Sequence, residues 1–319
     1  MDRATCDQEI RDAFYEQDQA VVVLRPKDGG SLWRSEVLSA LDEVCTAFED
    51  AQTGWDIAVK CITSVSLMEA RKGAPPQMVI LRDELPLKSE AERARVEALG
   101  TSLEFAIRDT IDAEGTRAYV HLPYASFEDV DIAALVAEQL AGQDVLDGAL
   151  DLPGSEPSPE YESLAGDGPS GRSFVGLYDA GTDGAIKDPE HLQVLDAFQE
   201  RAEGLKHVAQ SFTIVDDLKV TRQGLRGGKD EAFAVPTSRA EAAQLLLALS
   251  MSPATKLGPR LDGRERVGLI RVNLSPTSDD QARRTLRKLE TFLAQETPDG
   301  ARAFFCATAL PAETAEAAD

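Results

Sequence analysis

The sequence predicts an α+β protein made of two duplicated lobes, each with the split β-α-β order of ferredoxin-like domains and a helical insertion between its halves. Three observations support this prediction: strand and helix patterns alternate, their order occurs twice, and a stretch rich in Pro, Gly, Ser and acidic residues separates the copies. The expected domains are a first lobe over residues 1–150, a linker over 151–172 and a second lobe over 173–319.

The duplication is clearest in the first half of each lobe. A shift of 154 residues aligns the copies without a gap through the helix, so that Gly30 meets Gly184 and Asp42 meets Asp196. Each copy has a buried strand, a turn containing glycine and an amphipathic helix, for which Ser35 and Asp188 are the expected N-caps. The expected strands lie at 21–24 and 174–177, and further strands follow the helices at 57–65 and 211–215.

The second half of each lobe repeats more loosely. A strand with interspersed polar residues follows a charged turn, DAEG in the first lobe and LDGRER in the second, and a helix comes next. The expected strands are 116–122 and 267–274, the helices 127–141 and 278–295, and the last strands 145–152 and 303–308. The insertions are expected at 68–108, with a helix from about residue 89, and at 224–261, with a helix around 238–250.

Charge and hydropathy exclude several classes of function. The formal net charge of −23 is repelled by phosphate backbones and anionic lipid headgroups, which bind to clustered Lys and Arg, so nucleic acid is not an expected partner. The strongly apolar stretches at 131–140 and 241–251 are shorter than the roughly 20 residues that a membrane helix needs. The sequence itself therefore predicts no membrane span.

The residue types that carry chemistry form no recognisable constellation. The histidines are not at metal-ligand spacing, no CxxC or GxSxG occurs, and GLRGGKD lacks the first Gly and the Ser or Thr of a phosphate loop. The four cysteines are too few and too scattered for a disulfide scaffold, and Cys45 and Cys61 are expected to be small core residues. We therefore predict no enzyme activity, no metal and no cofactor. The residues concerned are His121, His191, His207, Cys6, Cys45, Cys61 and Cys306.

The order of several sequence blocks resembles the two large extracytoplasmic loops of resistance-nodulation-division (RND) transporters, in the branch of hydrophobe/amphiphile exporters and lipid transporters. The first lobe offers DAFYEQDQAVVVLRPKDGG, SEVLSAL and the segment 63–65. The second lobe offers IKDPEHLQVLDAFQERAEGL, IVDDLKVTRQGLRGG, FAVPTSRAEAAQLLLALSMS and RVNLSPTSDDQARRTLRKLETFLAQ. The resemblance covers nearly the whole chain apart from the central linker and the C-terminal tail.

This resemblance implies two porter-type lobes at the periplasmic face of a bacterial inner membrane, with the linker standing where the family has membrane helices. It implies the substrate-binding portion of a transporter that moves hydrophobic or amphiphilic lipids, with sterols or hopanoids as the favoured class. Contact with the membrane would then run only through helices absent from this chain. The alternative is a docking or oligomerisation scaffold of a multidrug or amphiphile efflux pump, which binds a periplasmic carrier or adaptor protein instead of a ligand.

The candidate ligand-binding residues are apolar side chains in or beside the two insertions. Methionine is adaptable and suits cavities for bulky apolar ligands. The competing interpretation is ordinary core packing, because apolar stripes usually face a core. The candidates are Leu67, Met68, Met78 and Leu81 in the first lobe and Phe233, Leu246, Leu247 and Met251 in the second.

Overall fold

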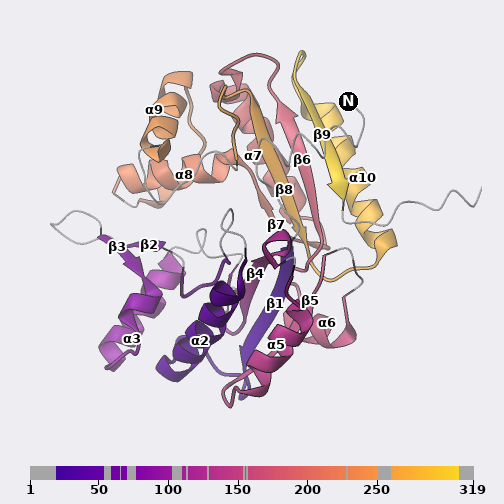
Figure 1. Cartoon of the computed structure of the whole chain (residues 1–319). Helices are drawn as coiled ribbons and strands as arrows, with labels where there is room; N and C mark the ends of the chain where they lie inside the picture. The colour runs from indigo at the N-terminus through magenta and orange to yellow at the C-terminus, as the bar shows by residue number, and fades with distance from the viewer. Residues whose placement is uncertain are drawn as a thin grey trace, which may run out of the picture.

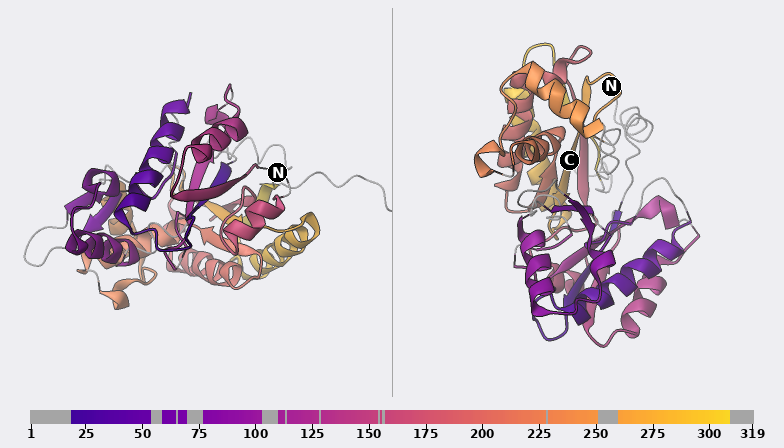
Figure 2. Two further views of the ribbon diagram at one scale, coloured as in Figure 1. Left: turned by 90° about the horizontal axis from the view of Figure 1, so that it is seen from below. Right: turned by 90° about the vertical axis from the view of Figure 1, so that its left-hand side faces the viewer.

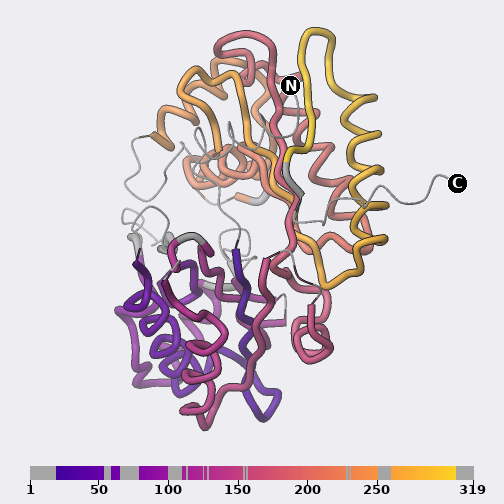
Figure 3. The backbone as a smooth tube through the Cα atoms, turned by 45° about the vertical axis from the view of Figure 1, so that its right-hand side comes forward, coloured from indigo at the N-terminus to yellow at the C-terminus, as the bar shows by residue number. Residues whose placement is uncertain are grey.

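The chain folds into two lobes, each built on an antiparallel sheet, and the first lobe lies below the second in Figures 1 and 3. The fold is mixed α+β, with sheets of three and four strands and a separate two-stranded hairpin. The computed structural model describes residues 19–53, 59–64, 66–69, 77–102, 110–112, 114–127, 129–153, 155, 157–227, 229–250 and 260–308.

The sheet of lobe one has its first strand in the centre. Strand β1 (Gln19–Pro26) pairs antiparallel with β4 (Ala118–Pro123) on one side and with β5 (Leu146–Asp151) on the other. Because side chains alternate along a strand, Val22 faces the main core and Val23 faces the opposite side of the sheet. Both faces of this sheet are therefore buried.

Two helices cover the main-core face of this sheet. Helix α2 (Ser35–Ala51) and helix α5 (Ile132–Ala141) place their apolar stripes in one cluster with the inward side chains of all three strands. Helix α2 begins at Ser35 itself, and its N-cap is Arg34, so the prediction that Ser35 caps the helix is wrong by one position. Helix α5 begins five residues later than predicted, after the short 3-10 helix η2 (Tyr124–Phe127).

The insertion of lobe one is a hairpin followed by a helix. Strands β2 (Ser66–Glu69) and β3 (Gln77–Ile80) pair antiparallel, and the 3-10 helix η1 (Leu81–Glu84) leads to helix α3 (Glu90–Ser102). Val96 and Leu99 of α3 join the core cluster of the lobe. The helix predicted to begin near residue 89 is confirmed.

Lobe two is also built on an antiparallel sheet, with four strands. Its sheet has the order β7-β8-β6-β9, and every neighbouring pair is antiparallel. The strands are β6 (Ser173–Asp179), β7 (Val208–Phe212), β8 (Val267–Leu274) and β9 (Arg302–Thr308).

Helices α7 (Pro189–Glu203) and α10 (Asp279–Glu296) pack against one face of this sheet, and the segment between β7 and β8 adds two more helices to the same core. The insertion therefore begins with α8, ten residues before the predicted start at 224. Helix α9 was predicted from the sequence, but helix α8 was not, because its segment IVDDLKVTRQGL follows a strand after one residue and carries Asp and Thr in its interior. The elements are η3 (Ala185–Lys187), α7 (Pro189–Glu203), α8 (Ile214–Leu225), η4 (Asp230–Ala232), α9 (Arg239–Ser250) and α10 (Asp279–Glu296).

The segment predicted as a linker is an ordered part of the fold. It contains helix α6 (Pro159–Ala165), which packs against β1 and β5 on the sheet face away from α2. The Tyr161 hydroxyl donates to the Pro169 carbonyl at 2.6 Å, and the Tyr119 hydroxyl donates to the Ala165 carbonyl at 2.9 Å. The two tyrosines thus hold in place a segment whose Pro, Gly and Ser content predicts an irregular linker on the surface.

The strand predicted at 57–65 is not a regular strand in its described part. Residues 59–64 form one bridge, between Lys60 and His121, and then a turn. A disulfide joins Cys61 to Cys45 on α2, with 6.3 Å between the Cα atoms. The β-propensity of this segment is overridden because its chain is tied to the helix instead of continuing along the sheet edge.

Candidate functional site

The cysteines correct one sequence prediction. Cys45 and Cys61 are fully buried, as expected of core residues, but they form a disulfide, and Cys306 in β9 is disulfide-bonded as well. The spacing of 16 residues between Cys45 and Cys61 gave no motif. Only the fold brings α2 against the segment after Lys60, so the pairing could not be read from the sequence.

The predicted ligand-binding residues separate into buried and exposed groups. Leu81 and Leu246 are 1% and 3% exposed and belong to the cores of their lobes, so their assignment to a ligand surface is not supported. Phe233 and Leu247 are 38% and 61% exposed on the insertion of lobe two, where Leu225 is exposed as well. Phe233 and Leu247 therefore have the exposed apolar surface that binding of a hydrophobic ligand requires.

The other predicted ligand-binding residues lie on the lobe-one hairpin or outside the described part. Leu67 and Met68 lie on β2, and Met78 lies on β3 opposite Met68. Met251 lies outside the described residues. Figure 1 places this hairpin and helices α8 and α9 on the same side of the molecule, and Figure 2 (right) turns that side towards the viewer.

Each insertion is fastened to the first helix of its lobe at an equivalent position. Arg82, in η1, donates to Asp42 of α2 at 2.5 Å and to Glu49 at 2.8 Å. In lobe two, Lys219 of α8 forms an ion pair with Asp196 of α7, the residue that aligns with Asp42. The two insertions are therefore held by the same carboxylate of the repeat.

A partly buried ion pair of lobe two lies near a lysine of lobe one. Asp217 of α8 pairs with Arg260 at 3.0 Å between Oδ2 and Nε. Burial raises the pKa of the Asp217 carboxyl, while the charges of Arg260 and of Lys60 in lobe one lower it. A carboxylate of lobe two thus lies within the field of a lysine of lobe one.

A second set of contacts closes the junction beside α6. The Gly171 amide donates to Asp151 Oδ2 at 2.7 Å, and the buried Arg172 lies 2.7 Å from Asp279 Oδ1 at the start of α10. Burial raises the pKa of Asp151 to about 6, and the hydrogen bond from Gly171 and the charge of Arg172 lower it. The end of β5 is therefore fixed to both lobes.

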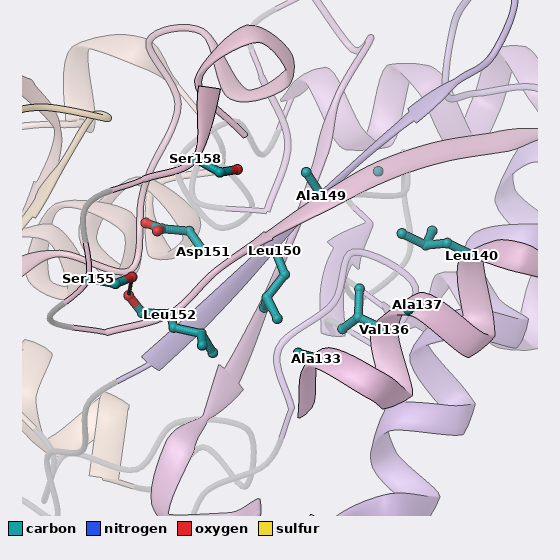
Figure 4. A pocket seen from close by; sticks show the side chains of 11 residues that line it. Ala133, Val136, Ala137, Leu140, Ala149, Leu150, Asp151, Leu152, Ser155 and Ser158 are labelled. Carbon is teal, nitrogen blue, oxygen red and sulfur yellow. Dashed lines mark hydrogen bonds between the residues drawn. The ribbon is translucent and has the colours of Figure 1, made fainter. Parts of the chain in front are cut away.

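A largely apolar hollow lies between α5 and β5. Its volume is about 390 Å³, and it straddles the outer edge of β5 (Figure 4). Helix α5 contributes mainly small side chains, and the end of β5 adds one carboxylate and two nearby serines. The lining residues are Ala133, Val136, Ala137, Leu140, Gly148, Ala149, Leu150, Asp151, Leu152, Ser155 and Ser158.

The sequence analysis missed this groove, although a signal was present. The segment IAALVAEQLA was predicted as a helix, and its alanines at positions 133 and 137 are one helical turn apart. Small residues at that spacing leave a shallow channel beside a neighbouring strand. The position of β5 at the sheet edge, which only the fold decides, turns this channel into an accessible site.

His191 occupies a buried structural position. The Tyr178 hydroxyl lies 2.7 Å from His191 Nδ1, both residues are buried, and burial lowers the pKa of His191. Within the described ranges no group of three or more His, Cys, Asp or Glu is placed to hold a metal ion. No helix there is long and apolar enough to cross a bilayer.

Comparison with known protein families finds no match, and no curated protein is significantly similar to this chain.

Proposed function

We propose that this chain is the extracytoplasmic part of an RND-type transporter and that it receives a hydrophobic or amphiphilic lipid, with sterols or hopanoids as the favoured class. The observation that carries the proposal is the similar order of elements in the two lobes: in each lobe the first strand pairs antiparallel with two later strands, and both insertions lie on one side of the molecule. The order of sequence blocks resembles that family over nearly the whole chain.

Both lobes are ferredoxin-like in this proposal. In lobe two, β6 lies between β8 and β9, with β7 beyond β8, which is the order of a split β-α-β sheet. Lobe one has β1 between β4 and β5, and the bridge at Lys60 occupies the place of β7. The pairing registers agree: Val22 faces Val120, and Gly176, 154 residues after Val22, faces Ile270.

The disulfides support an extracytoplasmic location. Structural disulfides form and persist in oxidising compartments such as the bacterial periplasm and are rare in the reducing cytosol. Cys45 and Cys61 are both fully buried, away from solvent reductants, as expected of a structural bond.

The ligand surface in this proposal is the exposed apolar group of the lobe-two insertion, facing the side where the β2–β3 hairpin lies. Native mass spectrometry during titration with sterols, hopanoids, phospholipids and hydrophobic drugs tests it. We expect saturable one-to-one binding of one lipid class. Replacing Phe233 and Leu247 by Glu should weaken that binding by about tenfold or more, because each side chain loses roughly 1.5–3 kcal/mol of apolar burial.

A matched control is Tyr124→Glu, which alters a residue that is 47% exposed and lies outside both insertions. It should leave the affinity unchanged. If every lipid class binds weakly or not at all, the proposal that this chain receives a lipid is wrong. The docking scaffold would then be the better proposal, and the groove beside β5 is the observation that favours it.

A further inference from the structure

We propose that the outer face of the lobe-two sheet is the docking site of the N-terminal segment of this chain, residues 1–18, and that a disulfide between Cys6 and Cys306 holds the segment there. The outer face is the side of the sheet that points away from helices α7 and α10. This docking site is independent of lipid transport.

The cysteines of the chain leave one partner for Cys306. Cys45 and Cys61 are bonded to each other, and Cys306 on β9 is disulfide-bonded as well. The sequence contains four cysteines, so the remaining one is Cys6. The Cys306 side chain is 0% exposed, and a second copy of the chain would reach its sulfur only by displacing the residues that cover it. A bond within one chain is therefore the expected pairing.

The outer face is buried although no described helix packs its apolar stripe against it. Leu177 on β6, Leu269 on β8 and Cys306 on β9 are 2%, 7% and 0% exposed. Within the described residues their apolar cluster consists only of side chains from these three strands, whereas helices α7 to α10 pack in the core on the opposite face. A sheet face buries its apolar side chains only against a further layer. We therefore expect that layer from residues outside the described ranges.

The path of the chain brings the N-terminal segment to this face. Strand β1 opens lobe one and pairs near its start with the end of β5. The Asp151 carboxylate at that end accepts from the Gly171 amide at 2.7 Å, two residues before β6. Phe174 on β6 pairs with Thr308 at the end of β9. The residues before β1 therefore leave lobe one close to the part of β9 that carries Cys306.

The composition of the N-terminal segment suits the outer face. Ile10, Ala13 and Phe14 follow Cys6 at the spacing of one helical face, which predicts an apolar stripe that includes the cysteine. The segment has six acidic and two basic residues. Arg271 of β8 lies on the outer face, and its removal from water lowers its pKa to about 10. An acidic segment carries the charge that favours the protonated guanidinium.

The disulfide would be a second covalent connection between the lobes. The N-terminal segment continues directly into β1 of lobe one, whereas Cys306 belongs to lobe two, and the first connection is the chain between β5 and β6. Forming the bond joins the two sulfur atoms and removes two protons and two electrons, which a small external disulfide accepts as it becomes two thiols. Reduction reverses this step and frees the segment to leave the apolar face.

Tryptic peptide mapping of the full chain, purified and digested without reductant, tests the pairing. Cleavage after Arg3, Arg11 and Arg302 places Cys6 and Cys306 in separate peptides, 4–11 and 303–319. We expect these two peptides to be joined in the monomer and separated by dithiothreitol. A Cys6 thiol that an alkylating reagent labels in the unfolded, unreduced chain overturns the proposal. The same bond found only between two chains of a dimer overturns it as well, and would assign the face to a second copy.

Two variants of the segment make a matched pair that tests the docking. Phe14→Gln removes an aromatic ring from the apolar stripe, whereas Tyr15→Gln removes one from the opposite side of the same expected helix. Hydrogen exchange over residues 7–18 should become at least fivefold faster in Phe14→Gln and change less than twofold in Tyr15→Gln. Unchanged exchange in α10 reports that lobe two is folded in both variants. Equal exchange over 7–18 in the two variants overturns the proposal.

Discussion

In both lobes the first helix, α2 or α7, is fixed to the chain that leaves the edge of the sheet, but by different chemistry. We call this contact the helix–edge joint. In lobe one, Cys45 on α2 is covalently bound to Cys61, one residue after the bridge at Lys60. In lobe two the aligned residue on α7 is Gln199, and the Thr213 hydroxyl, one residue after β7, lies 2.8 Å from its side-chain oxygen. Within residues 59–64, the described part of that segment, the disulfide accompanies a single bridge, whereas the hydrogen bond in lobe two accompanies the strand β7.

This difference shows what the joint requires. The first helix must be fixed to the chain that leaves the sheet edge, since the insertion of each lobe begins there. Lobe two achieves this with a β-ladder and with the Gln199 amide, which donates to the Ser211 carbonyl at 3.2 Å and to Asp216. Lobe one shows one bridge in its described residues 59–64 and fixes the helix through a covalent bond.

The largest expected effect is the loss of that bond. Replacing both Cys45 and Cys61 by Ser should destabilise lobe one by about 3 kcal/mol, because the unfolded chain regains the freedom of a loop of this size. Urea unfolding followed by tryptophan fluorescence measures it, since Trp33 and Trp55 both belong to lobe one. Hydrogen exchange in β7 and β8 serves as the control. If exchange there rises as much as in lobe one, the lobes unfold together and the effect is not local.

A pH-dependent effect of on the order of 2 kcal/mol is expected at the edge strand of lobe one. The folded pKa of Asp151 is about 6, above the unfolded value of about 3.9, so the folded state binds the additional proton. Its contribution to stability is complete below about pH 4 and is lost as the pH rises through about 6. Asp151→Asn should remove this loss while its amide oxygen still accepts from Gly171. Unfolding free energies from pH 4 to 8 test this, and parallel curves for both proteins would contradict it.

In lobe two, Gln199→Ala should lower the free energy of unfolding by about 2 kcal/mol, because buried partners of the amide lose their hydrogen bonds. Hydrogen exchange should rise in β7 and at the start of α8 and stay unchanged in β4. A cost equal to that of the cysteine replacement would mean that the amide holds the joint as firmly as the disulfide. A cost near zero would mean that the β-ladder alone is sufficient.

The smallest expected difference concerns the turn before the third strand. Gly115 and Glu265 align in this turn and have left-handed backbones, with φ of 65° and 54°. A Cβ on Gly115 would lie 2.7 Å from the Trp33 ring nitrogen, so Gly115→Ala should cost about 2 kcal/mol. Glu265→Gly relieves the backbone but loses the ion pair with Lys187, and its net effect should stay within about 1 kcal/mol. Thermal unfolding compares the two, and a large loss in Glu265→Gly would refute the equivalence.

Much of the fold could be predicted because similar patterns of apolar residues occur in both halves of the sequence and each supports the assignment of the other. The strand predicted at 267–274 is β8. The final helix of lobe two differs from its prediction by one residue at each end, and the final strand by one residue at its start. Helix α8 was missed because a strand, a turn and a helix follow without a breaker. The candidate site was predicted less well, since apolar residues such as Leu81 and Leu246 follow the same pattern in a core as on a binding surface.

The sequence by itself determined the α+β class and the absence of a recognisable catalytic motif, and it predicted the duplication, because these depend on periodicity and residue type along the chain. Only the tertiary structure decided the Cys45–Cys61 bond, the ordering of α6 and the groove beside β5. Each of these depends on which distant segments meet and on which strand is left at the edge of a sheet. That information lies in packing between elements and not in the pattern within any one of them.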